Sequence, residues 1–120
     1  MTNDAQTTIR QMLEPLLRFR DARDWKQFHN PKDQALSLVL EAAELLELMQ
    51  WRNGPELQEH LTANKDRLAE ELADVLGWVL LLAHDQQIDL AAALQRKIQI
   101  NEQKYPVEKA RGVATKYTEL

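Results

Sequence analysis

Residues 31–52 read PKDQALSLVLEAAELLELMQWR, and this stretch decides the fold. Asn30 supplies an N-cap residue, Pro31 suits the first turn of a helix, and Asn53-Gly54-Pro55 supplies a stop, so the stretch predicts one long helix. Apolar residues cover nearly every face of this helix. Such a helix needs more covering surface than a short chain readily supplies. The stretch therefore predicts a buried helix within an all-α protein.

The remaining sequence also reads as helices, and strand signals are few. A second long helix is predicted for residues 65–86, with an apolar stripe at helical spacing. Further helices are expected at about residues 5–22, with Pro15 as a kink or a late start, at about 55–61, and from an Asp89 cap to about 103. No useful periodicity follows Pro106. The prediction is a four-to-five-helix bundle.

Length and composition limit the class of protein. The 120 residues are 44% apolar, carry a net charge of −4 and contain no cysteine. They predict a single domain, 1–120, with a helical core at about 5–104 and a basic tail at 105–120. The charge argues against binding to nucleic acid or an anionic membrane. No signal peptide is evident and the longest apolar run, 75–83, is too short to span a bilayer, so we expect a cytoplasmic protein.

Two acidic pairs lie inside the two most apolar stretches. They are Glu41-x-x-Glu44 and Glu71-x-x-Asp74. Carboxylates three residues apart share one face of a helix, so two such helices facing each other would form a cage of four carboxylates. Like charges in a partly dry core favour a bound cation, and oxygen donors favour Mg²⁺ or Mn²⁺. For either pair alone, a solvated acidic face is the alternative.

These pairs resemble the E-x-x-E and E-x-x-D motifs of the all-α, MazG-like nucleotide pyrophosphohydrolases. The segments that resemble the dCTP pyrophosphatase branch are Arg23-Asp24-Trp25-x-x-Phe28-His29-x-Pro31, Gln50-Trp51, Asn101-x-x-Lys104-Tyr105-Pro106 and Lys116-Tyr117-Thr118. The resemblance runs from about Arg23 to Leu120. It implies hydrolysis of a deoxynucleoside triphosphate, dCTP or a modified dCTP, to the monophosphate and pyrophosphate. It also implies that Glu41, Glu44, Glu71 and Asp74 hold Mg²⁺, with Mn²⁺ as a substitute, and carry catalysis.

The resemblance further implies a substrate site made of basic and aromatic residues. The expected phosphate-binding residues are Lys97, Asn101, Lys104, Arg111 and Lys116, of which the first three also share one helix face by their spacing. Aromatic faces that suit a pyrimidine are expected at Trp25, Trp51 and Trp78, and His29 is expected to contact base or phosphate. Surface charge and core packing are the respective alternatives. Trp78 stands where tyrosine is expected in the branch, so cytosine preference stays open.

The apolar helices and the family resemblance both predict a homo-oligomer, a tetramer first and a dimer second. The apolar faces of the helices need a further surface to cover them. Two other functions stay open. One is a house-cleaning pyrophosphohydrolase for other noncanonical deoxynucleotides or for dUTP. The other is a non-catalytic helical assembly module whose acidic residues are structural.

Overall fold

The computed structural model describes residues 2–120, and within that range all regular elements are helices, which confirms the all-α prediction. The chain forms two compact units, the first ending at Gln87 and the second comprising Ile88–Leu120. The helices of the first unit are α1 (Ile9–Ala22), α2 (Pro31–Glu47), α3 (Gly54–Ala63) and α4 (Lys65–Asp85). The second unit contains α5 (Leu90–Lys104) and α6 (Val107–Ala110). Short 3-10 helices occupy Lys26–Phe28 and Tyr117–Glu119.

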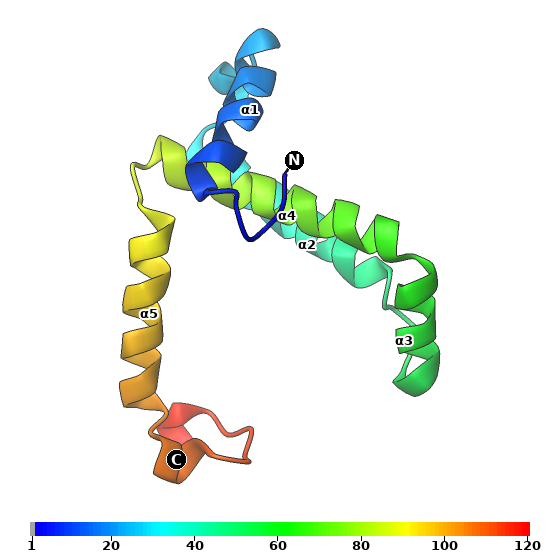
Figure 1. Cartoon of the computed structure of the whole chain (residues 1–120), viewed down its shortest axis with the longest axis vertical. Coiled ribbons are helices and arrows are strands. Elements are labelled where there is room, and N and C mark those ends of the chain that lie inside the picture. Colours follow the sequence, from blue (N-terminus) through cyan, green and yellow to red (C-terminus); the bar gives the residue numbers. More distant parts are fainter. Residues whose placement is uncertain (1) are drawn as a thin grey trace. The chain divides into compact units, whose positions relative to one another are not determined.

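Helix α4 is the centre of the first unit. It packs along α2 and also contacts α1 and α3, as Figure 1 shows. The most deeply buried apolar side chains are Leu48, Leu80, Leu81 and Ala83. Three of these four lie on the C-terminal half of α4, where its apolar stripe meets the other helices. The core is therefore small, and most of it lies where the C-terminal end of α4 meets the N-terminal end of α2.

Many large apolar side chains of α2 and α4 remain exposed in the single chain. They are Leu36, Val39, Leu40 and Leu46 on α2, and Leu72 and Leu76 on α4, all between 42% and 63% exposed. A contiguous exposed apolar face is unusual on a monomer and marks an interaction surface. The apolar character of α2 thus exceeds what the other helices of this unit cover.

The first helix begins four residues later than the pattern predicted. Thr8 is its N-cap, and a capping box closes the end: the Thr8 hydroxyl accepts from the Gln11 N–H at 3.1 Å, and the Gln11 side chain accepts from the Thr8 N–H at 2.9 Å. Such reciprocal bonds satisfy two backbone groups that would otherwise lack partners. Pro15 lies inside the helix.

Helix α2 ends at Glu47, before the predicted limit at Arg52, because the chain turns ahead of the Asn53-Gly54-Pro55 signal. Trp51 has a φ of 69°, in the left-handed region that a bulky side chain rarely adopts. At the other end of the helix, Asn30 caps as predicted and accepts from the Asp33 N–H at 2.9 Å.

In the second unit, Asp89 caps α5 by accepting the Ala92 N–H at 2.9 Å. The tail after Pro106 contains α6 and a 3-10 helix, although its sequence shows no periodicity. Tyr117 anchors it: its ring lies edge-on to Tyr105, 5.9 Å between centroids, and the Lys104 ammonium lies 4.6 Å from the Tyr117 ring centre. These contacts hold the tail against the end of α5.

Within residues 2–120, none of the helices combines the length and the apolar character needed to cross a membrane.

Candidate functional site

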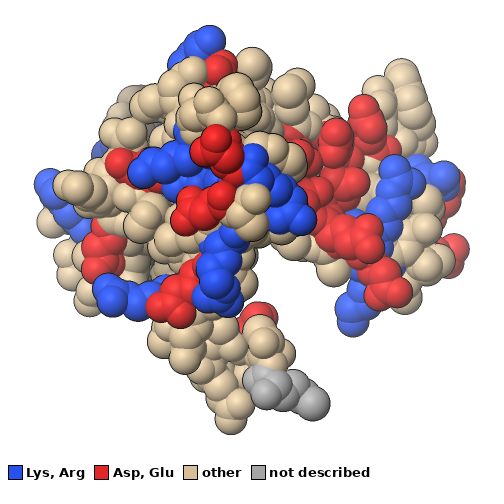
Figure 2. Space-filling view, turned by 90° about the horizontal axis from the view of Figure 1, so that it is seen from above, with Lys and Arg blue, Asp and Glu red and all other residues tan. Residues whose placement is uncertain are grey.

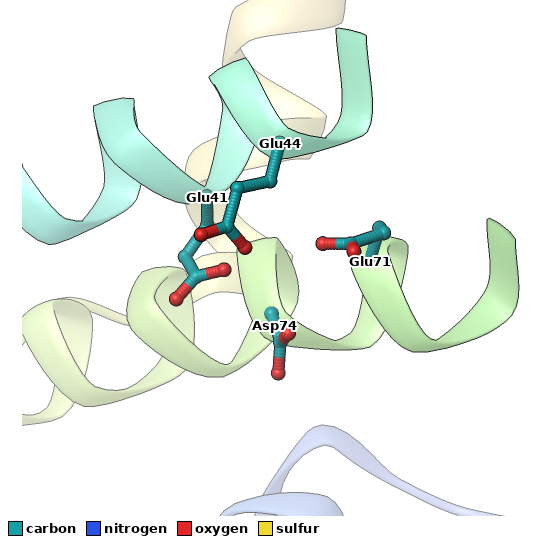
Figure 3. A group of neighbouring side chains, drawn as sticks. All are labelled: Glu41, Glu44, Glu71 and Asp74. Atoms are coloured by element: carbon teal, nitrogen blue, oxygen red, sulfur yellow. The ribbon is translucent and has the colours of Figure 1, made fainter. Parts of the chain in front are cut away.

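The structure brings the carboxylates of both acidic pairs together. Glu41 and Glu44 extend from α2, and Glu71 and Asp74 extend from α4; Figure 3 shows Glu44 and Glu71 pointing toward one another and Asp74 pointing away from α2. One carboxylate oxygen of each residue lies within 4.8 Å of the others. This follows from the i, i+3 spacing and from the packing of α2 along α4. Figure 2 shows acidic side chains gathered over the part of the first unit where α2, α3 and α4 lie.

The cluster is strained electrostatically. Desolvation raises the pKa of Glu41 above its ordinary value of 4.5, and Glu44, by hydrogen bonding and by charge, raises it further. Desolvation likewise raises the pKa of Glu71, followed by the charge of Glu44 and then that of Asp74. The Oε2 atoms of Glu41 and Glu71 are buried and have no hydrogen-bond partner. Buried carboxylate oxygens without donors are costly, and a bound cation could satisfy them.

The donor set fits a hard divalent cation. Its four members offer carboxylate oxygens alone, the ligand type that suits Mg²⁺ and Mn²⁺. Half-buried Glu41 and Glu71 alternate with exposed Glu44 and Asp74, so the cluster is open to solvent on one side. A cluster that is open in this way can hold an ion that also contacts a ligand.

An apolar cavity of about 230 Å³ adjoins the cluster through Asp74. Three of the predicted substrate residues line it together: Trp25, His29 and Trp78. The His29 ring lies edge-on to the Trp78 indole, with centroids 5.0 Å apart and planes at 61°. The other lining residues are Leu16, Phe19, Arg20, Ala73, Gly77 and Leu81. A pocket with aromatic walls and few polar groups suits a flat ring, while the acids at its edge suit a cation.

Burial lowers the pKa of His29 below its ordinary value of 6.5; the charge of Arg20 lowers it further, and Asp85 opposes this. The shift favours the neutral form of the His29 imidazole. A neutral imidazole can donate or accept one hydrogen bond beside the ring site.

A polar network that sequence reasoning missed lies on the same side of the first unit. Arg20 is 2% exposed and Gln34 is 1% exposed, and both bond to the Asp85 carboxylate. A signal was present in the sequence: Arg20, Gln34 and Asp85 each stand four positions from a leucine of the same helix, namely Leu16, Leu38 and Leu81. A polar residue in the apolar register of a helix is buried, and a buried polar residue needs a partner.

The structure does not bring Trp51 to this cavity within one chain. It is 89% exposed and lies in the turn after α2, with its positive φ. A fully exposed tryptophan in a rarely populated backbone conformation lacks a packing role in the single chain, so the core-packing alternative does not hold for Trp51.

The five predicted phosphate residues all belong to the second unit. Lys97, Asn101 and Lys104 lie on α5, Arg111 follows α6, and Lys116 precedes the last 3-10 helix. Of these, Lys104 has the aromatic contact with Tyr117 described above. Their roles stay predictions.

This chain is similar to a known protein family and to relatives of known name. The model of the MazG-like family matches residues 36–120. The dCTP pyrophosphatase 1 of Rattus norvegicus is 44% identical over 104 residues, and that of Homo sapiens is 42% identical over 104 residues. The match covers 85% of this chain and 61% of each relative, so the chain spans about three fifths of their length.

A solved structure gives the same picture. The crystal structure of a pyrophosphatase from Archaeoglobus fulgidus is similar with a TM-score of 0.79 and 37% sequence identity, over 88% of this chain and 99% of that one. The family match covers well over half of the chain and includes both acidic pairs. The chain belongs to the MazG-like family.

Proposed function

We propose that this protein hydrolyses a deoxynucleoside triphosphate to the monophosphate and pyrophosphate. One observation carries the proposal: four convergent carboxylates adjoin an aromatic cavity, with Asp74 belonging to both. A cation site next to a ring site matches the two ends of a nucleoside triphosphate. The names of the similar proteins, dCTP pyrophosphatase and pyrophosphatase, support the same reaction class.

We propose Mg²⁺ as the cofactor, with Mn²⁺ able to replace it, held by Glu41, Glu44, Glu71 and Asp74. A divalent cation supplies neutralisation of phosphate oxygens and acidification of water. The orphaned oxygens of Glu41 and Glu71 support this assignment, since a cation would satisfy both.

The residues of the chain have three further tasks in this reaction. The carboxylates fix the geometry of the polyphosphate end, because phosphoryl transfer depends on positioning and charge neutralisation more than on covalent catalysis. One carboxylate of the cluster orients the attacking water and accepts its proton. The apolar walls of the cavity exclude water from the base end.

The base binds in the cavity that Trp25, His29 and Trp78 line, and it stacks on a tryptophan ring. Ring stacking of this kind is worth about 1–3 kcal/mol per base. We propose dCTP or a modified dCTP as the substrate, in line with the names of the relatives. Other noncanonical deoxynucleotides and dUTP are the competitors, since an indole at position 78 offers a donor alone.

The resemblance of their segments supports a further proposal: Lys97, Asn101, Lys104, Arg111 and Lys116 bind the phosphates of the substrate. The family match covers all five residues.

We further propose a homotetramer, with a dimer as the smaller form. The exposed apolar side chains of α2 and α4 support it, since a second copy would remove them from water. The exposed Trp51 supports it too: in an assembly it would cover the site of a neighbouring copy.

The test is a substrate panel. Purified protein is incubated with Mg²⁺ and dCTP, 5-methyl-dCTP, dUTP, dTTP or dATP, and products are separated by ion exchange. Monophosphate and pyrophosphate in equal amounts are expected, with the highest kcat/KM for a cytosine nucleotide. Diphosphate and phosphate would overturn the reaction class, and no turnover of any nucleotide would favour a non-catalytic assembly module.

A further inference from the structure

A buried ion pair with a third partner adjoins the aromatic cavity through Arg20. The Arg20 guanidinium donates from Nη1 to Asp85 Oδ2 at 2.7 Å and from Nη2 to Asp85 Oδ1 at 2.9 Å. Gln34 Nε2 donates to Asp85 Oδ2 at 2.7 Å. Such two-pronged contacts between guanidinium and carboxylate fix both groups in orientation as well as in distance.

Each member of the network belongs to the segment that holds one aromatic wall. The Arg20 carbonyl accepts the Trp25 N–H at 3.1 Å, so Arg20 anchors the backbone of that wall directly. Asp85 lies seven residues after Trp78 on α4, two turns further along the same helix face. Gln34 lies in the first turn of α2, five residues after His29, and its N–H donates to the carbonyl of Asn30, the residue that follows His29, at 2.9 Å.

Stability alone is a poor explanation for this network. Arg20 Nε and Gln34 Oε1 are buried and unpaired, so the network leaves polar groups unsatisfied. Apolar residues of similar volume often replace a buried ion pair without loss of stability. Apolar contacts have no preferred direction, so they do not fix how the segments are oriented. Three hydrogen bonds to one carboxylate have preferred distances and angles, so they hold three segments at one relative position. Arg20 also lines the cavity itself.

We propose that Arg20, Gln34 and Asp85 are positioning residues that hold Trp25, His29 and Trp78 at the spacing a flat heteroaromatic ring requires. This inference rests on the proposed function, in which the bound ring is the base of the nucleotide substrate. The network touches no reacting atom and acts through the aromatic walls.

The test compares ring binding with folding. The triple variant Arg20→Met, Gln34→Leu, Asp85→Leu removes every polar group of the network and leaves no charge unpaired. Deoxycytidine, thymidine and deoxyuridine are titrated without metal into the full chain, and binding is followed by tryptophan fluorescence, with deoxyribose as the blank. Helical content and melting temperature are measured in parallel. Arg18→Met, an exposed arginine two residues from Arg20 on α1, is the matched control.

We expect the triple variant to keep its helical content and melting temperature while the Kd for the nucleoside rises roughly tenfold or more, because displaced aromatic walls lose their stacking on the ring. The control should bind as the natural chain does. An unchanged Kd in the folded triple variant would overturn the proposal. So would a natural chain that binds none of the three nucleosides.

Gln34→Leu alone covers the case in which the triple variant fails to fold. It removes one bond and no charge, and we expect a smaller rise in Kd with an unchanged melting temperature. An unchanged Kd here, with the triple variant unfolded, would show that the network is structural and sink the idea. Because the probes are bound and not cleaved, absence of pyrophosphate release would defeat the proposed activity without deciding this test.

Discussion

Arg20 and Asp85 lie 65 residues apart in the sequence, and their side chains form a two-pronged ion pair with 2.7 and 2.9 Å hydrogen bonds. The pair joins the end of α1 to the end of α4. The side chain of Arg20 is 3% exposed and that of Asp85 is 12% exposed.

Removing one member of this pair should be far more harmful than removing the whole network. Arg20→Met leaves the Asp85 carboxylate buried with Gln34 as its sole partner, so we expect a loss of about 3–5 kcal/mol in the free energy of unfolding. Urea denaturation measures it, with Arg18→Met expected within about 0.5 kcal/mol of the natural chain. A loss below about 1 kcal/mol for Arg20→Met would show that the pair is more hydrated than its burial indicates.

Acid should weaken the fold through Asp85. The Arg20 hydrogen bond, with a smaller part from Gln34, lowers the pKa of Asp85 below its ordinary value of 3.8, against the opposing effect of burial. The unfolded chain then binds this proton more readily, so the contribution of Asp85 is present above pH 3.8 and is lost as the pH falls through the lowered value. Asp85→Asn should be less stable at pH 7 and show a flatter decline below pH 4. Parallel declines in both proteins would contradict this.

The acidic cluster should respond to pH with the opposite sign. The pKa values of Glu41 and Glu71 are raised, mainly by desolvation, so the metal-free fold loses stability as the pH rises above 4.5. Mg²⁺ competes with these protons. Its stabilisation of the fold should therefore grow as the pH rises from below 4.5 towards neutrality, measured as the shift in melting temperature at fixed Mg²⁺. A shift that does not depend on pH would contradict a role for these carboxylates as ligands.

Replacement of single carboxylates by neutral amides should impair the protein at cluster residues and have little effect at Glu70, which lies outside the cluster on α4. Glu71→Gln and Asp74→Asn should each lower kcat/KM by roughly a hundredfold or more, abolish the Mg²⁺ shift and leave helical content intact. Glu71→Gln should also make the metal-free protein more stable at pH 7, since repulsion falls. Glu70→Gln, exposed and next in sequence, should be nearly silent. Full activity in either cluster variant would discredit the ligand assignment.

The exposed apolar face of α2 should control assembly. Leu46 is 63% exposed in the single chain, and Leu46→Lys places a charge where we propose that a second copy packs. We expect the mass in solution, from sedimentation or light scattering at micromolar concentration, to fall towards that of one chain. Gln58→Lys on α3 should leave the mass unchanged. A natural chain that sediments as a monomer would exclude the proposed tetramer.

Much of the fold could be predicted from local pattern. The Asn30 and Asp89 caps and the apolar stripe of α4 predicted helices that the structure contains, because caps and periodicity act over one or two turns. Helix α1 begins four residues later than the pattern predicts, because the capping box of Thr8 and Gln11 fixes its start. The early end of α2 could not be predicted, because no local sequence signal indicates that Trp51 adopts a left-handed backbone conformation.

The sequence by itself determined which residues share a helix face: the i, i+3 spacing alone placed Glu41 with Glu44 and Glu71 with Asp74. Tertiary packing decided which faces meet. It laid α2 along α4, it gathered Trp25, His29 and Trp78 around one cavity while leaving Trp51 outside, and it joined Arg20 to Asp85. The reason is physical: side-chain spacing along a helix follows from backbone geometry, whereas contacts between distant segments depend on how whole helices pack and bury their apolar faces.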